Sequence, residues 1–226
     1  QSWAVISGAG SPERARMALE QARRELVRRD ASLIQLLDPP FDKCENDPGY
    51  IKGYPPGVRE NGGQYTHAAA WLVMAHALLG DARNAWDLLG VINPVNHGSS
   101  PEQIGTYRVE PYVVAADVYA CPPHTGRGGW TWYTGAAGWL YRTIIESLLG
   151  LRREGTVLRI VPCIPPDWPP YKIHYRYRDT VYHLIITPGG ECRTVARLTV
   201  DGVDQEDKAV HLADDRVDHN VSVELA

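Results

Sequence analysis

The hydrophobic pattern of this chain changes its period once, near residue 151, and this change constrains the fold more than any other feature. Before it, apolar residues recur at helical spacing in segments divided by long loops. After it, residues 173–178, 181–187 and 194–200 show the short, alternating runs of half-buried strands. We therefore expect a mainly α chain with a C-terminal β part: a helical domain over residues 1–150 and a small β-sandwich domain over residues 151–226.

Capping signals set the expected helix ends. Ser11-Pro12-Glu13 supplies an N-cap serine, a proline at the first helical position and an acid in the first turn, which predicts a helix start. Further helices are expected over residues 64–79, 81–92, 113–119 and 134–149, the last ended by Gly150. Helix pairs with long loops stack into solenoids or toroidal barrels whose loops at one end build a site. We expect the loops before residues 67, 112 and 135 to converge in this way.

Residues 126–139 (GRGGWTWYTGAAGW) combine glycines, aromatic rings and a threonine at a helix start. Glycines let a backbone approach a ligand closely, Trp and Tyr rings suit the faces of sugars, and a Thr134-Gly135 helix start offers a hydroxyl and free N–H groups to an anion. The chain also favours Trp (7) and Tyr (12) over Phe (1). The stretch therefore indicates the anion-and-sugar corner of a carbohydrate site, although a buried aromatic turn with Thr134 as an ordinary N-cap explains it equally well.

The segment from Asp38 to Gly63 is a long loop rich in Pro and Gly, and such loops in compact chains are usually functional or disordered. Glu60, beside Arg59, has two interpretations: it binds sugar hydroxyls or acts as an acid or base, or it only caps backbone amides. His67 lies near the next helix start, where an imidazolium would meet a phosphate. A helix-face histidine bonded to a neighbour is the more ordinary explanation.

The composition disfavours several classes of function. A net charge of −4 gives no nucleic-acid signature, no apolar run is long enough to span a bilayer, and no signal peptide opens the chain. His97, His124 and Cys121 lack metal-ligand spacing, so no metal site is expected. The chain starts at Gln1 rather than Met, which favours a fragment or a processed product. The cysteines are widely spread, which favours free thiols in a reducing, cytoplasmic compartment: Cys44, Cys121, Cys163 and Cys192.

The chain carries five longer motifs: YPPGVRENGGQYTHA (54–68), NPVNH (93–97), VEPYVVAADVY (109–119), GGWTWYTG (128–135) and PCIPPDWP (162–169). Together they resemble glycoside hydrolase family 94, which contains cellobiose and chitobiose phosphorylases and the C-terminal region of cyclic β-1,2-glucan synthases. They stand in the family's order and cover nearly the whole chain, although only weakly after about residue 190, and the segment 109–119 is most similar to the glucan synthase branch. The resemblance implies the C-terminal part of an (α/α)6 barrel followed by a β-sandwich domain.

The resemblance also implies a reaction, the cleavage of β-glycosidic bonds by inorganic phosphate with inversion of the anomeric centre and no other cofactor. By resemblance, His67, Thr134 and the amide of Gly135 hold the phosphate. The substrate-binding side chains implied for the sugar are Tyr54, Arg59 and Glu60, and residues 130–133 become mainly support packing. Because phosphate is already an anionic nucleophile, one general acid suffices where an inverting hydrolase needs an acid and a base.

In the family that acid is an aspartate in a Trp-Asn-Asp motif, which would lie upstream of Gln1, and this chain contains no such motif. We therefore expect an enzyme in the parent protein but an inactive chain on its own. The implied partners are an oligo- or polysaccharide, phosphate and the missing N-terminal part of the barrel. The location could be the cytoplasmic part of a larger membrane-associated synthase, and homodimerisation is left open.

Two alternatives remain open at this point. One is an inverting hydrolase of the same barrel class, with Glu60 as the base for water. The other is a non-catalytic glucan-binding fragment of a cyclic β-1,2-glucan synthase. Added phosphate separates the first from phosphorolysis, because only phosphorolysis yields a sugar 1-phosphate.

Overall fold

A computed structural model describes residues 1–132, 134–189 and 194–226, and it divides the chain into two compact units. The first unit comprises residues 1–79 and 84–143, and the second comprises residues 80–83 and 144–226. The chain as a whole mixes helix and sheet, with most helices in the first part of the sequence and most strands in the second. The expectation for Cys192 lies outside the described residues, and the other three cysteines are free thiols.

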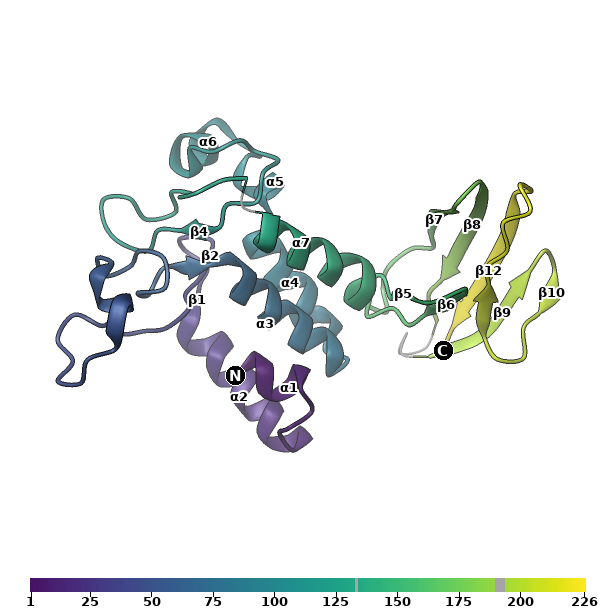
Figure 1. The fold of residues 1–226 in the computed structure, drawn as a ribbon, viewed down its shortest axis with the longest axis horizontal. Coiled ribbons are helices and arrows are strands. Elements are labelled where there is room, and N and C mark those ends of the chain that lie inside the picture. Colours follow the sequence, from purple (N-terminus) through teal and green to yellow (C-terminus); the bar gives the residue numbers. More distant parts are fainter. Residues whose placement is uncertain (133, 190–193) are drawn as a thin grey trace. The chain divides into compact units, whose positions relative to one another are not determined.

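The first unit is built around one central helix, α3 (Thr66–Leu78), which packs against α1 (Ser2–Ile6), α2 (Pro12–Leu26) and α7 (Thr134–Arg142). Side chains all round α3 are buried, as expected of a helix that is apolar on nearly every face. Its alanines are small and let the neighbouring helices approach closely. The buried residues are Thr66, Ala69, Ala70, Leu72, Val73, Ala75, His76 and Ala77. Figure 1 shows α3 and α7 both starting beside the gathered loops and running away from them in the same direction.

Local signals explain most of the remaining helix ends. Ser11 accepts a hydrogen bond from the Arg14 amide at 3.4 Å and Pro12 is the first residue of α2, so the predicted start is confirmed. Residues 82–92 form α4 (Ala82–Ile92), as predicted. Two short helices that were not expected follow, α5 (Pro94–His97) and α6 (Pro101–Tyr107), each opened by a capping side chain and a proline.

The helix predicted over residues 113–119 is wrong. This segment contains a turn and a short strand, β4 (Asp117–Val118), which pairs antiparallel with β3 (Gln64–Tyr65). The Ala116 amide donates to the Trp130 carbonyl at 2.7 Å, and the Ala116 carbonyl accepts from the Thr66 amide at 2.9 Å. Bonds to distant segments thus replace the helical ladder. The last helix is also shorter than expected, because α7 ends at Arg142 and a π-helical stretch, η2 (Thr143–Leu148), follows it.

The long loop before α3 is tied down by buried amide side chains. Asn61 is fully buried, accepts from the Phe41 amide at 2.7 Å, and donates to the carbonyls of Phe41 and Tyr54 at 3.2 and 2.8 Å. Gln64 accepts from the Ile34 amide at 2.9 Å, which joins the loop to the hairpin of β1 (Val27–Arg28) and β2 (Leu33–Ile34). A 3-10 turn, η1 (Gly49–Gly53), lies within the loop. These bonds fix the segment that carries residues 54–60.

The second unit holds two sheets. The five-stranded sheet has the order β10-β9-β12-β8-β7, antiparallel throughout except for the parallel pair β12–β8, and the three-stranded sheet has the order β11-β6-β5. The three longest strands, β7, β8 and β12, alternate between more and less buried side chains, as the period-two pattern predicts. The bounds are β5 (Leu151–Glu154), β6 (Val157–Ile160), β7 (Tyr171–Tyr177), β8 (Thr180–Thr187), β9 (Val195–Val200), β10 (Val203–Asp204), β11 (Ala209–His211) and β12 (His219–Leu225).

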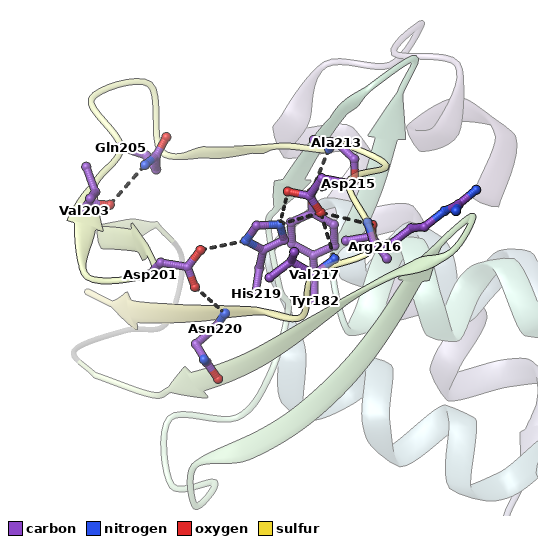
Figure 2. A network of polar contacts seen from close by, with 11 residues as sticks. Tyr182, Asp201, Val203, Gln205, Ala213, Asp215, Arg216, Val217, His219 and Asn220 are labelled. Carbon is purple, nitrogen blue, oxygen red and sulfur yellow. Dashed lines mark hydrogen bonds and ion pairs between the residues drawn. The ribbon is translucent and has the colours of Figure 1, made fainter.

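A charged network joins the start of β12 to two loops of this unit (Figure 2). Nδ1 of His219 lies 2.6 Å from Oδ2 of Asp201, and Nε2 lies 3.1 Å from Oδ2 of Asp215. The His219 ring also stacks on Tyr182 at 4.9 Å. The Asp201 and Asp215 carboxylates raise the pKa of His219 above its ordinary value, so the imidazolium holds the two loops together.

Candidate functional site

Polar and aromatic side chains meet at the N-terminal start of α3, in the first unit. They come from the long loop, from the β3–β4 pair and from the glycine-rich segment that precedes α7. The loops predicted to converge do so: the Arg59 guanidinium lies 5.9 Å from the Trp130 ring centroid, and Trp132 Nε1 donates to Glu110 at 3.0 Å. The described members of the cluster are Tyr54, Arg59, Glu60, Tyr65, His67, Asp117 and Trp130.

Arg59 lies at the centre of the cluster. Its guanidinium is 5.4 Å from the Tyr54 ring centroid and 5.9 Å from that of Trp130, and its Nε donates to Glu60 Oε2 at 3.4 Å. It also donates a hydrogen bond to the Tyr65 side chain. Its backbone has a φ of +49°, a left-handed conformation that is uncommon for a residue other than glycine. Arg59 is therefore held by contacts on several sides.

Asp117 is a buried carboxylate beside Arg59. Its residue is only 1% exposed, its Oδ1 accepts from the Trp130 amide at 3.2 Å, and its Oδ2 makes no hydrogen bond of normal geometry among the described residues. Burial raises the pKa of Asp117 above its ordinary value, the nearby Arg59 charge acts to lower it, and Glu60 acts to raise it. A buried carboxylate is expensive unless it is paired, so its neighbour Arg59 is part of what makes it tolerable.

His67 occupies the first turn of α3 and is half-buried. Its ring makes edge contacts with Tyr65 at 4.5 Å and Trp71 at 4.6 Å between centroids. Burial lowers the pKa of His67 below its ordinary value, while the Glu60 carboxylate acts to raise it. The imidazole therefore interacts electrostatically with the Glu60 carboxylate. Because its pKa is lowered, it is largely neutral near pH 7.

Thr134 and Gly135 are the first residues of α7, and both are exposed. A Cβ added at Gly135 would meet no other atom within 4 Å. Trp139, one turn further along, contacts Trp71 of α3 at 5.5 Å between centroids. Since His67 lies one turn before Trp71, this contact holds the starts of the two helices in the same region of the unit.

The aromatic rings of the glycine-rich segment do not behave as support packing. Trp130 is 56% exposed and Trp132 is 67% exposed, although both are anchored by hydrogen bonds of their segment. Tyr133 lies outside the described residues. The interpretation of residues 130–133 as mainly packing is therefore wrong for Trp130 and Trp132, which present their rings at the surface of this chain.

Asp117 and Tyr65 are the cluster residues that the sequence prediction missed. Asp117 is the one charged residue in the apolar run 113–119, and a lone acid in such a run is a signal for a paired buried charge. The helix predicted there hid that signal, because it placed the residue on a helix face. Tyr65 was passed over as part of the expected helix 64–79, whereas it belongs to β3 opposite Asp117.

Within the described ranges, no three His, Cys, Asp or Glu side chains are arranged to bind a metal ion. The helices of the same ranges are too short or too polar to cross a bilayer. The cluster itself offers hydrogen bonding, ring contact and charge, from the guanidinium of Arg59, the carboxylate of Glu60 and the exposed ring of Trp130.

Comparison with known proteins gives matches over the helical part and beyond. The model of the glycosyl hydrolase 94 superfamily catalytic domain matches residues 1–150. The cyclic beta-(1,2)-glucan synthase NdvB of Rhizobium meliloti (strain 1021) is 49% identical over 187 residues, which are 83% of this chain and 7% of that protein. Solabiose phosphorylase of Paenibacillus borealis is 31% identical over 100% of this chain and 29% of its own length. N,N'-diacetylchitobiose phosphorylase of Vibrio proteolyticus is 29% identical over 88% of this chain and 24% of its own length.

These matches confirm the resemblance inferred from the motifs, including the similarity to a glucan synthase. The chain spans less than a third of the length of each of these relatives.

Proposed function

Because the chain belongs to the glycosyl hydrolase 94 superfamily, we propose that it supplies the phosphate and acceptor half of an inverting glycoside phosphorylase site acting on β-linked glucosides. In this proposal His67, Thr134 and the amide of Gly135 bind phosphate, and Tyr54, Arg59 and Glu60 face the acceptor sugar. The chain is the C-terminal part of an (α/α)6 barrel, and its second unit is the β-sandwich domain that follows.

The packing of α3 against α7 is the observation that carries the proposal. The Trp71–Trp139 contact brings together two helix starts, one with an imidazole and the other with an exposed threonine and an exposed glycine. Free N–H groups and the positive end of the helix dipole at such starts favour an anion. Two starts side by side are suited to a dianion with several oxygens.

The carboxylate and rings beside these starts suit a sugar. The Glu60 side chain is 16% exposed and keeps Oε1 outside its ion pair with Arg59, so it is positioned to accept a hydrogen bond from a hydroxyl. Tyr54 and Trp130 flank Arg59 and offer flat apolar faces. A pyranose between these groups and the helix starts would have its acceptor side toward the long loop.

The proposed step forms a bond between a phosphate oxygen and the anomeric carbon while the glycosidic C–O bond breaks. The leaving oxygen takes a proton from the general acid, which we place upstream of Gln1, so the products are a sugar 1-phosphate of inverted configuration and the freed acceptor sugar. The His67 imidazole and the N–H donors hold and orient the phosphate. Without the acid, this chain binds the reactants and does not turn them over.

Binding tests the proposal on the chain itself. Titration calorimetry with inorganic phosphate should show binding that is weakened by His67→Ala and by Thr134→Val. The exposed His124 is the matched control, and His124→Ala should bind phosphate like the parent chain. Phosphate binding that is indifferent to both site substitutions would contradict the assignment and favour a glucan-binding fragment.

Turnover tests the missing half. A β-glucobiose with phosphate should give no product with this chain alone, and a sugar 1-phosphate when the chain is preceded by a polypeptide that carries the Trp-Asn-Asp motif. Phosphate-dependent turnover by these 226 residues alone would refute the division of the site. Free sugar without sugar 1-phosphate would instead indicate a hydrolase.

A further inference from the structure

We propose that Asp117 is the positioning residue of the acceptor side, and that its buried carboxylate fixes Arg59 between the rings of Tyr54 and Trp130. The inference rests on the proposed function for the identity of the ligand, a β-linked glucoside. The positioning of Arg59 itself stands on the structure of this chain and can be measured without a ligand.

The first argument is that Asp117 joins segments that are far apart in the sequence. It lies opposite Tyr65 in the β3–β4 pair, and Tyr65 is the residue directly before the start of α3. Its Oδ1 accepts from the Trp130 amide, and the Asp117 carbonyl accepts from the Gly129 amide at 2.9 Å. The carboxylate therefore ties the glycine-rich segment to the strand that leads into His67.

The second argument is that the segment is shaped to admit this carboxylate. A Cβ on Gly129 would lie 2.7 Å from Asp117 Oδ2 and 2.8 Å from its Cγ, and closer still to Oδ1. Atoms that are not hydrogen-bonded do not approach to such distances, so residue 129 must lack a side chain while an acid occupies position 117. Gly129 is therefore explained by Asp117.

The third argument is electrostatic. Asp117 is 1% exposed, one of its oxygens has no hydrogen bond of normal geometry among the described residues, and its charge is stabilised first by the Trp130 amide and then by the nearby charge of Arg59. The same arginine pairs with Glu60 and spans two rings. The attraction of Asp117 fixes where the guanidinium lies, and the guanidinium fixes the rotamer of Glu60. Asp117 thus shapes the sugar side without touching the sugar.

Asp117→Asn tests this, because it removes the charge, keeps the shape beside Gly129 and still accepts from the Trp130 amide. Calorimetry with sophorose, the β-1,2-linked glucobiose, should show affinity reduced about tenfold, the order expected when a charged hydrogen-bonding partner is lost. Phosphate affinity should not fall, since the phosphate ligands lie on the two helix starts and the lost charge is negative. Arg59→Met should give a similar loss, and the double variant should be no weaker than Arg59→Met alone.

Thr143→Val is the matched control, because Thr143 is also fully buried and its Oγ1 also lacks a hydrogen bond among the described residues, at the far end of α7. It should leave sophorose affinity unchanged. Sophorose binding that survives in Asp117→Asn would overturn the proposal. So would an equal loss of sophorose and phosphate binding in a folded Asp117→Asn chain, because Asp117 would then support the unit in general.

A ligand-free measurement separates this proposal from the proposed function. The Arg59 Nε–H signal in ¹H–¹⁵N spectra, assigned by its absence in Arg59→Met, should be sharp in the parent chain and in Thr143→Val, and broadened in Asp117→Asn. If the parent chain does not bind sophorose but this broadening occurs, the acceptor assignment fails and the positioning of Arg59 stands. If the signal is the same in Asp117→Asn, the positioning is refuted whatever the chain binds.

Discussion

The contact between Gly129 and Asp117 makes Gly129→Ala a sensitive test of the site's construction. An added methyl would overlap the buried carboxylate, as the 2.7 and 2.8 Å approaches to Oδ2 and Cγ show. Overpacking of this kind costs about 1–3 kcal/mol, and escape by turning the acid away loses its bond to the Trp130 amide, a loss of about 1.5–3 kcal/mol. The chain takes the cheaper route, so we expect a loss of about 1–3 kcal/mol in the free energy of unfolding.

Gly138→Ala is the matched control. Gly138 lies inside α7 with nothing near the position of a Cβ, so the same change there should stabilise by about 0.5–1 kcal/mol through helix propensity. Tryptophan fluorescence follows the first unit, which contains every tryptophan except Trp168. Gly129→Ala should lower the unfolding temperature by about 2–12 °C.

A double variant decides the cause. In an Asp117→Ala background, the methyl at residue 129 meets no carboxylate, so Gly129→Ala should then cost less than about 0.5 kcal/mol. A Gly129→Ala chain as stable as the parent would refute the close contact. An equal cost with and without the acid would show that the strain comes from the backbone of residue 129.

Two further predictions concern other buried or paired groups. His219→Gln should lower the stability of the second unit most between the ordinary pKa values of 3.8 for Asp and 6.5 for His. The raised pKa of His219 means that the stability contributed by its imidazolium is complete below pH 6.5 and is lost as pH rises through the pKa of the folded chain. The lowered pKa values of Asp201 and Asp215 mean that this stability is also lost as pH falls through the folded pKa values of the two carboxylates. Calorimetry across this range, with the exposed His211→Gln as control, checks both limits. Asn61→Ala removes three hydrogen bonds of the long loop and should cost about 3 kcal/mol, measured by urea unfolding, and a loss below 1 kcal/mol would contradict the anchoring.

Local chemistry explains which parts of this fold could be predicted. The start of α2 depends on Ser11 and Pro12, which act within one turn, and the strands of the second unit depend on a period of two that needs no partner to be recognised. The convergence of the loops also followed from the sequence, since helix pairs place their starts at one end. These features are encoded by residues close together in the chain.

The features that could not be predicted depend on distant partners. Residues 113–119 have a helix-like apolar pattern, yet Ala116 bonds to Trp130 on one side and to Thr66 on the other. Two such bonds over 14 and 50 positions cannot be inferred from a window of one helix. For the same reason the pairing of β12 with β8 in parallel, which brings residues 219–224 beside 182–187, has no local signal. Asp117 was missed because its partners, Trp130 by hydrogen bond and Tyr65 in the strand pair, lie 13 and 52 positions away.

The charges of the cluster make a last prediction about the phosphate side. Arg59 carries one positive charge, and Glu60 and Asp117 carry two negative charges, so the described cluster opposes a dianion unless a proton enters. His67 is the group positioned to take that proton, because its pKa is lowered by burial and an anion beside it would raise it again. Anion binding near pH 7 should therefore be accompanied by proton uptake by His67.

Sulfate is the sharper probe of this coupling, because phosphate titrates near pH 7 and sulfate does not. Calorimetry with sulfate in buffers of different ionisation enthalpy should show uptake of about one proton per anion at pH 7, and affinity should fall about tenfold per pH unit between the pKa of His67 in the free chain and its pKa in the complex. His67→Asn should abolish the uptake, and His124→Asn should retain it. Uptake that persists in His67→Asn would place the proton elsewhere, and binding without uptake would mean that the donors of the two helix starts outweigh the carboxylates by themselves.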